Sequence, residues 1–456
     1  MSPDVSFGER LLQEPATRAQ RALATRVMAT ALAAVEPAEA VRRALRREGD
    51  RLMAGEREYD LARYARVLVV GAGKAGAPMA RAVEDVLGER VAAGLVVVKH
   101  GHGGPTRTVA LREAGHPIPD EGCVSGTEAL VELVAASGPD DLVIVVISGG
   151  GSALMLLPET GISLDDMQRT TDLLLRAGAT INELNAVRKH LERAKGGGLA
   201  RLARPSDVIA LALSDVVGNP LDVIASGPTV PDTTTFADAC AIAERLGVWD
   251  RLPASVAERL RAGREGQVPD TPKPGDPLFE RTQTLVVASN ELAAVAAVRQ
   301  AEEEGLRALL LSTYVEGEAR EVARVFAALA REEVAHDRPL PRPCCLVAGG
   351  ETTVRVRGQG LGGRNQELAL ATVEKLAGLD NVLLAALATD GNDGPTDAAG
   401  ALVDGTTLAR ARAHGLDPGR FLDDNDAYHF FEPLGDLLRT GPTNTNVNDL
   451  LFVFAW

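Results

Sequence analysis

The sequence predicts an α/β fold with two domains built on largely parallel sheets. Short runs of Val, Leu, Ile and Ala alternate with longer segments of helical periodicity along the 456 residues, and this alternation is typical of parallel strands joined by helices. A glycine-rich turn follows the first strong run, which predicts a Rossmann-like N-terminal domain. Residues 263–277 are rich in Gly, Pro and charge and lack apolar periodicity, so we take them as a linker. The predicted domains are therefore residues 1–262 and residues 278–439.

Eight apolar runs have the length of strands and carry the predicted sheets. An Ala-rich helical segment, residues 16–47, precedes them, and a helix over residues 75–87 follows the first run. The strand-like segment of residues 447–456 is able to pair with either sheet, so in one alternative the tail of residues 440–456 returns to the N-terminal domain. The eight runs are residues 67–70, 94–98, 142–147, 208–213, 284–288, 306–311, 344–347 and 381–387.

The composition excludes several classes of partner. The chain has a net charge of −15 and only 3% aromatic residues. Nucleic-acid-binding proteins use a basic surface and stacking aromatic rings, and this composition supplies neither. No apolar run approaches the about 18 residues of a membrane helix, and the N-terminal segment resembles neither a signal nor a transit peptide. We therefore expect a cytoplasmic protein that binds neither nucleic acid nor membrane. Its four cysteines lack C-x-x-C spacing, which favours reduced, buried thiols.

The turn after the first strand, residues 71–76, has the sequence GAGKAG. Gly71 and Gly73 would let the backbone approach a phosphate closely, and the first amides of the following helix would face that anion. Lys74 adds a positive charge, and its place here is informative because the chain has only six lysines against 42 arginines. The turn predicts a phosphate site, although a plain strand-to-helix turn would need the same glycines.

The same turn would suit a dinucleotide, which makes a further demand. A dinucleotide site needs an Asp or Glu for the ribose hydroxyl about 20 residues further on, after the second strand. The second strand here ends in Lys99 and His100, which fit a nicotinamide dinucleotide poorly and a ribose 2′-phosphate somewhat better. The NAD interpretation is therefore disfavoured.

A second glycine-rich loop follows the third predicted strand. Open α/β sheets bind ligands at the carboxyl ends of their strands, and glycines flanked by hydroxyls can bind an anion there. A flexible loop without a ligand is the alternative. The residues of this predicted anion loop are Ser148, Gly149, Gly150, Gly151 and Ser152.

Three charged residues occupy comparable positions. Asp215 follows the fourth strand, where a carboxylate can act as a base, bind a metal or cap a helix. Arg364 stands where a glycine-rich loop joins a helix, from which its guanidinium can bind phosphate oxygens. Asp390 follows the eighth strand in an acidic loop that is open to Mg²⁺, to a substrate hydroxyl or to an Asx turn. Residues 184–203 predict a helix with a solvated polar face.

These motifs together resemble the class II glycerate kinases, the glycerate 2-kinase family, over nearly the whole chain. Several motifs in the same order are far more specific than any one alone. They are GAGKAG at 71–76, SGGGS at 148–152, NAVRKHL at 185–191, SDVVG at 214–218, ASGPT at 225–229, GGETT at 349–353, GGRNQE at 362–367, TDGNDG at 389–394 and TGPTNTNVND at 440–449.

The resemblance implies a kinase that uses ATP and Mg²⁺ to phosphorylate the 2-hydroxyl of D-glycerate, giving 2-phosphoglycerate, with its active site in the cleft between two α/β domains. The family's essential lysine falls on Lys74, its arginine on Arg364 and its aspartates on Asp215 and Asp390. One departure is Asn219, where the family usually has Asp, so a role that needs a carboxylate there is in doubt.

Phosphoryl transfer requires phosphate-binding loops, a metal and well-placed cations rather than covalent chemistry. We therefore expect Gly71, Gly73 and the loop of residues 148–152 to bind ATP. Lys74 and Arg364 would bind the transferring phosphoryl group and the substrate carboxylate, and Asp215 would orient or deprotonate the 2-hydroxyl. Asp390 would bind substrate, and either Asp215 or Asp390 would bind the metal.

Two other functions stay open at this point. An NADPH-dependent hydroxypyruvate reductase could use the G-x-G-x-x-G turn and Lys99, and members of this family have sometimes carried that label. A non-catalytic sensor of sugar acids or nucleotides would bind phosphates without turnover, but it would not need the lysine, the arginine and both aspartates. The oligomeric state does not follow from the sequence, and a homodimer is one alternative.

Overall fold

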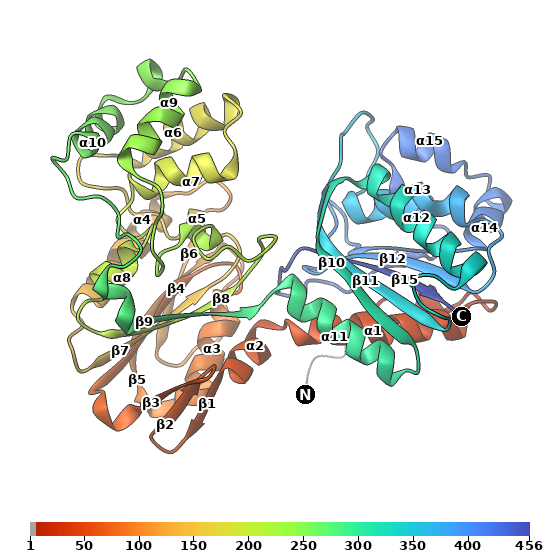
Figure 1. The fold of residues 1–456 in the computed structure, drawn as a ribbon, viewed down its shortest axis with the longest axis horizontal. Coiled ribbons are helices and arrows are strands. Elements are labelled where there is room, and N and C mark those ends of the chain that lie inside the picture. Colours follow the sequence, from red (N-terminus) through yellow and green to blue (C-terminus); the bar gives the residue numbers. More distant parts are fainter. Residues whose placement is uncertain (1–5) are drawn as a thin grey trace. The chain divides into compact units, whose positions relative to one another are not determined.

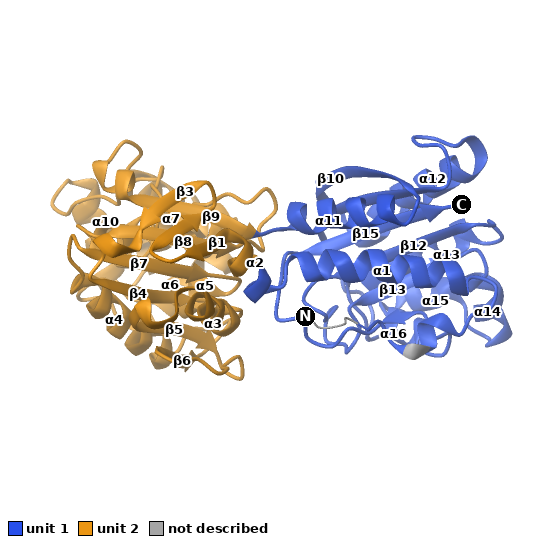
Figure 2. Cartoon of the chain, turned by 90° about the horizontal axis from the view of Figure 1, so that it is seen from below, with its two compact units in different colours: residues 1–39, 288–456 blue, residues 40–287 orange. Residues whose placement is uncertain are grey.

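The computed structural model describes residues 6–456. The chain forms two compact units, coloured separately in Figure 2. Unit 2 is Ala40–Val287, and unit 1 combines Met1–Glu39 with Ala288–Trp456. All four cysteines are buried free thiols, as their spacing predicts. Within residues 6–456, no helix combines the length and the apolar character needed to cross a bilayer.

Unit 2 is built on a six-stranded sheet (Figure 1), and its strands follow the order β6-β5-β4-β7-β8-β9, which can be followed in Figure 2. The pairs from β6 to β8 are all parallel. Counted from β4, the order is 3-2-1-4-5-6, that of a doubly wound sheet, which binds ligands where the order reverses. The reversal lies between β4 and β7. The strands are β4 (Arg66–Ala72), β5 (Val91–Lys99), β6 (Val109–Ala114), β7 (Asp141–Ile147), β8 (Asp207–Leu213) and β9 (Thr282–Ala288).

The helices of unit 2 begin at clear sequence signals. Helices α6, α7 and α9 start with capping boxes, in which Ser163, Thr180 and Thr235 exchange hydrogen bonds with an acidic residue three positions on. The helices are α3 (Gly76–Leu87), α4 (Glu121–Ala135), α5 (Gly151–Leu154), α6 (Leu164–Arg176), α7 (Ile181–Lys189), α8 (Gly198–Leu202), α9 (Phe236–Arg245) and α10 (Ala254–Arg264).

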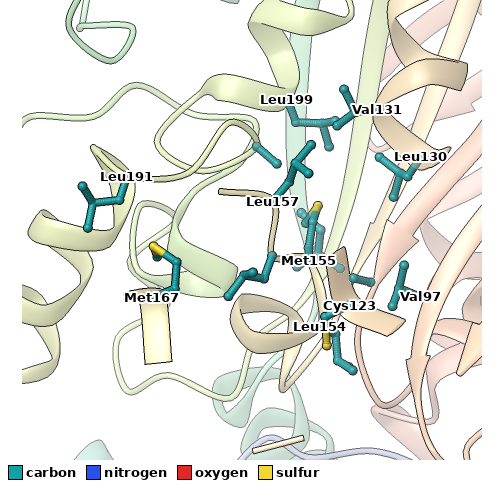
Figure 3. Packing of buried hydrophobic residues seen from close by; sticks show 14 of the residues in the cluster. Val97, Cys123, Leu130, Val131, Leu154, Met155, Leu157, Met167, Leu191 and Leu199 are labelled. Atoms are coloured by element: carbon teal, nitrogen blue, oxygen red, sulfur yellow. The ribbon is translucent and has the colours of Figure 1, made fainter. Parts of the chain in front are cut away.

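The core of unit 2 anchors the chain directly after the loop of residues 148–152. Leu154 and Met155 are buried in the same apolar cluster as Cys123 and Leu130 of α4 (Figure 3). Strand β7 is buried at every position, as expected for a central parallel strand covered on both faces. The loop between β7 and this cluster is therefore fixed at both ends.

An antiparallel meander of three short strands precedes the main sheet of unit 2. Its strands are β1 (Leu45–Glu48), β2 (Arg51–Ala54) and β3 (Arg57–Asp60). The expected helix over residues 16–47 is instead α1 (Arg18–Ala34) and α2 (Pro37–Ala44), followed by β1. Four-residue strands with charged, exposed positions carry too little alternation to be recognised in a sequence.

Unit 1 contains a second six-stranded sheet, in the order β10-β11-β15-β12-β13-β14. Only β10 and β11 are parallel, and the other neighbours are antiparallel. The expectation of largely parallel strands is therefore confirmed for unit 2 alone. The strands are β10 (Arg307–Glu318), β11 (Cys344–Thr353), β12 (Val382–Ala388), β13 (Gly400–Asp404), β14 (Leu437–Leu438) and β15 (Asp449–Ala455).

The helices of unit 1 include one from the start of the chain. Helix α1 packs against α11 (Asn290–Glu303), and Arg26 forms an ion pair of 2.7 Å with Glu304. Residues 6–39 thus belong with unit 1 rather than with the N-terminal domain expected for them. The remaining helices are α12 (Ala319–His336), α13 (Arg364–Leu376), α14 (Thr407–Ala413), α15 (Pro418–Asp423) and α16 (Ala427–Phe431).

The C-terminal tail and the expected linker also lie in other units than the sequence predicts. Strand β15 pairs with β11 on one side and β12 on the other, so the tail joins unit 1 and does not return to the first sheet. Residues 263–277 do not separate the units, because Asp270 contacts His190 at 2.9 Å and Thr271 contacts Asp232 at 2.9 Å inside unit 2. The following strand, β9, completes the sheet of unit 2.

Candidate active site

The turn of residues 71–76 emerges from β4 at the reversal point of the unit 2 sheet. Its amides are not available to an anion, contrary to the expectation from the motif, because four in succession donate hydrogen bonds within the protein. They run from Gly73 to the Val97 carbonyl (3.0 Å), Lys74 to the Gly149 carbonyl (2.9 Å), Ala75 to Ser148 Oγ (3.0 Å) and Gly76 to the Gly73 carbonyl (3.1 Å).

The glycines of this turn are explained by packing. A Cβ on Gly71 would lie 1.9 Å from the Val146 carbonyl oxygen, and one on Gly73 would lie 2.1 Å from Ser148 Oγ. Both distances are far below van der Waals contact, so a side chain at either position would push the turn away from β7 and its loop. The turn thus holds the neighbouring loop of residues 148–152 in place.

That loop offers the free donors that the turn lacks. The amides of Gly149 and Gly150 donate to no acceptor within residues 6–456. Gly150 has a φ of 81°, a left-handed conformation that glycine adopts without strain. Successive unpaired amides around a left-handed residue form an anion-binding concavity. The predicted anion loop therefore has suitable geometry at Gly149 and Gly150.

Three functional side chains surround these two glycines. A Cβ on Gly149 would lie 2.6 Å from Asp215 Oδ2, and one on Gly150 would lie 3.0 Å from His116 Nε2 and 3.5 Å from Lys74 Cγ. Adjacent Cα atoms are only about 3.8 Å apart. Lys74, His116 and Asp215 each lie two residues beyond a strand, after β4, β6 and β8 respectively. The parallel sheet thus brings Lys74 and Asp215 together and adds His116.

The cluster combines the positive charge of Lys74 with the carboxylate of Asp215. The Lys74 side chain has no hydrogen bond or ion pair within residues 6–456. Burial lowers the pKa of His116 to about 4, and the nearby charges of Lys74, Lys99 and His102 act in the same direction. The imidazole is therefore neutral at physiological pH, and Lys74 supplies a cation that a phosphate can use.

Asn219, the departure from the family pattern, lies in the turn after Asp215. Its φ is 54°, in the left-handed region where Asn is several-fold enriched over most residues. The backbone at this position therefore accepts Asn without special strain.

Ser152, the last residue of the anion loop, forms hydrogen bonds to side chains in the interior of unit 2. Its hydroxyl contacts Ser226 Oγ at 2.8 Å and accepts a hydrogen bond from Arg188 Nη1 at 3.1 Å, while Lys195 Nζ donates to its carbonyl at 2.7 Å. Glu192 pairs with Arg188 at 3.1 Å and with Lys195 at 2.8 Å. This buried group of charges fixes the end of the loop.

The solvated face expected for residues 184–203 is therefore wrong. Arg188, Lys189, Glu192 and Lys195 are buried, and the segment forms two short helices, α7 and α8, rather than one. Burial lowers the pKa of Lys195 to about 8. Charged residues at helical spacing usually predict a surface. Here Glu192 pairs with Arg188 and Lys195 within the segment, and the further contacts that bury these charges come from distant loops, from Ser152 and Asp232.

Unit 1 carries a pocket of about 790 Å³ beside two other predicted residues. Arg364 and Asp390 both line it, together with residues 352–354 at the end of β11 and the glycine-rich segment that leads into α13. This volume is within the range of about 300–1,000 Å³ that is typical of small-molecule sites. The structure therefore places Arg364 and Asp390 in one cavity.

Arg364 is held by two carboxylates in this pocket. Its Nε and Nη2 donate to Asp449 at 2.6 and 3.1 Å, and its Nη1 donates to Glu351 at 2.6 Å. Burial raises the pKa of Asp449 to about 7, although the Arg364 guanidinium opposes that shift. A guanidinium has five N–H groups, so after these three hydrogen bonds two remain for a ligand.

The acidic loop after β12 has divided roles. Asp393 is buried and accepts hydrogen bonds from the amides of Asn365 and Gln366 at 3.1 and 2.8 Å, which caps α13. Asp390 lines the pocket and accepts a hydrogen bond from the Asn392 amide at 3.1 Å, the Asx-turn contact foreseen as an alternative. Asp393 thus serves the fold, while Asp390 faces the cavity.

Asp215 and Asp390, the two predicted metal ligands, do not belong to a preformed metal site. Among residues 6–456, no group of three or more His, Cys, Asp or Glu side chains is arranged to hold a metal ion. Mg²⁺ is usually bound by one or two carboxylates together with substrate phosphates. A single carboxylate such as Asp215, beside two free amides, is compatible with that pattern.

Sequence reasoning missed His116, Asp449 and the ion pairs of Arg364. A lone histidine in a loop gives no motif signal, and the strand that it follows, β6, is not among the runs that the sequence predicts as strands. Asp449 could have been noticed in the motif at residues 440–449. Its pairing with Arg364, 85 residues earlier, depends on β15 entering the middle of the sheet and could not be read locally.

Comparisons with known proteins place the chain in a family. Residues 23–261 match a domain family described as a domain of unknown function, DUF4147, and residues 344–449 match the MOFRL family. The chain is 41% identical to a glycerate 2-kinase of Pyrococcus horikoshii, with 95% of this chain and 97% of that protein aligned. It is 44% identical to an Agrobacterium vitis protein provisionally named as a hydroxypyruvate reductase, with 84% and 86% aligned.

The fold is shared with a solved structure over almost the full length. The crystal structure of glycerate kinase from Thermotoga maritima superposes with a TM-score of 0.87 at 40% sequence identity, covering 96% of this chain and 100% of that one. Identity at this level over nearly complete chains, with the same two-unit α/β fold, shows common descent. The chain belongs to the glycerate 2-kinase family.

Proposed function

We propose that this protein transfers the γ-phosphoryl group of ATP to the 2-hydroxyl of D-glycerate, giving 2-phosphoglycerate and ADP. The observation that carries the proposal is the gathering of Lys74 and Asp215 around the free Gly149 and Gly150 amides, in a chain of this family. Phosphoryl transfer depends mainly on positioning and on stabilising charge that develops on the phosphoryl oxygens. A cation beside unpaired amides meets that requirement.

Each residue of the unit 2 cluster has a distinct role in this proposal. The Gly149 and Gly150 amides and the Lys74 ammonium bind anionic substrate oxygens, so they stabilise the transferring group. Asp215 accepts a hydrogen bond from the 2-hydroxyl and orients its oxygen for attack, as the catalytic-loop aspartate does in protein kinases. Gly71 and Gly73 act indirectly, because they allow the turn to support the loop.

Arg364 and Asp390 bind substrate groups in the unit 1 pocket. The two guanidinium N–H groups not used by Asp449 and Glu351 are suited to a carboxylate or phosphate oxygen. Asp390 accepts a hydrogen bond from a substrate hydroxyl. Asp449 and Glu351 hold the guanidinium at 2.6 Å on each side, so it is oriented before substrate binds.

Mg²⁺ is the metal that fits this donor set. A hard oxygen ligand such as Asp215 or Asp390 would contribute to binding the ion, and phosphate oxygens would complete its coordination. When bound, the ion neutralises charge on the phosphates. The protein groups bind and orient the substrates.

The test is a pair of assays on the purified protein. The first supplies D-glycerate with Mg-ATP, follows ADP formation and identifies the phosphorylated product by NMR. The second supplies hydroxypyruvate with NADPH and follows loss of the reduced cofactor. We expect ADP with 2-phosphoglycerate and no NADPH oxidation. NADPH oxidation without ADP formation would overturn the proposal, and 3-phosphoglycerate as product would overturn its regiochemistry.

A further inference from the structure

His116 lies against the anion loop although no motif singles it out. The Cδ2–Nε2 edge of its ring faces Gly150, at 2.9 and 3.0 Å from the position of a Cβ there. It follows β6 by two residues, as Lys74 follows β4 and Asp215 follows β8. Because β4, β6 and β8 run in the same direction, these side chains lie at one edge of the sheet.

The surroundings of His116 differ from those of a structural histidine in the same unit. The buried His190 has both ring nitrogens occupied, at 2.6 Å from the Ala186 carbonyl and 2.9 Å from Asp270. His116 forms no ion pair with a carboxylate within residues 6–456, and the charges of Lys74, Lys99 and His102 oppose its protonation, although Asp215 lies beside the neighbouring Gly149. Two of the chain's six lysines therefore lie near this ring.

These neighbours decide the form of the imidazole. Burial and the three basic groups lower the pKa of His116 to about 4, so at neutral pH the ring carries one N–H and no charge. A third full cation beside Lys74 and Lys99 would be repelled in the free protein. A neutral ring adds a hydrogen-bond donor without that repulsion.

We propose that His116 is a substrate-binding residue, whose imidazole hydrogen bonds to an anionic oxygen held at the Gly149 and Gly150 amides. The proposal rests on the kinase function proposed above. The acceptor is a phosphate oxygen of ATP or a carboxylate oxygen of the hydroxy acid, and both are anionic oxygens that suit a donor beside Lys74. His116 thus completes a site of two amides, one cation and one neutral ring.

The test compares His116→Ala, His116→Gln and the control His100→Ala in steady-state kinetics with each substrate varied. The glutamine amide reaches as far as Nε2 and can replace its hydrogen bond. His100 is a nearby exposed histidine that contacts Asp120. Thermal melting of each variant checks that the fold is kept. If His116→Ala is unstable, His116→Asn replaces it, because the shorter asparagine amide does not reach the position of Nε2.

We expect His116→Ala to lower kcat/KM by about 10- to 100-fold, the size expected for a lost hydrogen bond to a charged group. His116→Gln should recover most of this loss, and His100→Ala should be unchanged. A rise in KM for ATP alone identifies a phosphate oxygen as the acceptor, and a rise for D-glycerate alone identifies the carboxylate.

Two results would overturn the contact while leaving the kinase function intact. One is kcat/KM within twofold of the wild type for His116→Ala with both substrates. The other is an equal loss in the alanine and glutamine variants, which would show that the ring matters only for packing. A wild-type protein that does not phosphorylate D-glycerate would instead overturn the proposed function and this contact with it.

Discussion

Lys74 is distinguished from the buried lysines of unit 2 by the lack of an ion pair. Lys195 pairs with Glu192 at 2.8 Å and Lys189 pairs with Asp232 at 3.3 Å, whereas no carboxylate of residues 6–456 lies within ion-pair distance of Lys74. An unpaired ammonium beside two unpaired amides is available to a phosphate. The contrast separates a cation that serves a ligand from cations that serve the fold.

Replacing Lys74 by alanine should therefore affect catalysis far more than stability. We expect Lys74→Ala to lower kcat by about 10³-fold, by analogy with cations that stabilise phosphoryl transfer elsewhere, with little change in melting temperature. The measurement is ADP formation with saturating D-glycerate and Mg-ATP. Lys375→Ala, at an exposed site in the last turn of α13, is the matched control, and a near-normal kcat for Lys74→Ala would refute the assignment.

Asp449, which holds Arg364 in the unit 1 pocket, should make the free energy of unfolding depend on pH. Its folded-state pKa is raised to about 7 by burial, so between about pH 4 and pH 7 the folded protein holds a proton that the unfolded chain has released. The free energy of unfolding therefore falls as the pH rises through this interval. Stability from this group is present at low pH and is lost as the pH passes about 7.

The variant Asp449→Asn should remove this contribution. We expect the stability of wild type relative to the variant to be greater at pH 5 than at pH 7.5, by on the order of 2 to 4 kcal/mol. Chemical denaturation at the two pH values measures the difference. A relative stability that does not change between them would show that Asp449 titrates near its ordinary pKa in the folded protein.

At the level of elements, the eight predicted strands are all present. A strand that is buried on both faces of a sheet is a continuous apolar run, which is easily recognised in the sequence. The strands β1 to β3, β6, β13 and β14 were missed, since each has only two to six residues and gives too little pattern. The strand-end rule selected Lys74 and Asp215, which the structure places around the loop of residues 148–152. It could not reveal that the amides of residues 73–76 are occupied, because three of their four acceptors come from β5 and from the loop after β7.

Gly73 illustrates why this turn must approach its neighbour so closely. A Cβ there would lie 2.1 Å from Ser148 Oγ and 2.7 Å from the Ser148 carbonyl oxygen. Gly101 has a φ of 76° and no atom within 4 Å of its Cβ position. The two glycines share a positive φ but differ in the space around them.

Alanine substitution at both positions separates close packing from backbone strain. We expect Gly73→Ala to destabilise the protein by about 1–3 kcal/mol more than Gly101→Ala, since overpacking costs that amount beyond the strain of a positive φ. Denaturant unfolding of the two variants gives the comparison. Equal losses would mean that the turn can move away from Ser148 at little cost.

For the molecule as a whole, the main feature is that unit 1 is assembled from segments at both sides of unit 2 in the sequence. Helix α1 packs on α11, and β15 lies between β11 and β12. Unit 2, by contrast, is one continuous stretch, Ala40–Val287, with its own apolar core. The two units should therefore differ in their dependence on distant parts of the chain.

Removal of residues 449–456 should unfold unit 1 and spare unit 2. The deletion takes out a strand that is hydrogen bonded on both sides and buried along its length, and it also removes the carboxylate that holds Arg364. We expect one unfolding transition to disappear from calorimetry while a second persists, and the separate fragment of residues 40–287 to show that same second transition. Loss of both transitions would contradict independent cores.

The central position of β15 also sets the order of events during synthesis. Unit 2 is complete in sequence once residue 287 has been translated, and domains generally fold as they emerge from the ribosome. Helix α1, made first, must then wait for α11, and β11 and β12 stay unpaired along one edge until residues 449–455 have been made. The nascent chain therefore exposes apolar strand edges late in translation, so unit 1 should be the part that depends on chaperones and that aggregates when translation stalls.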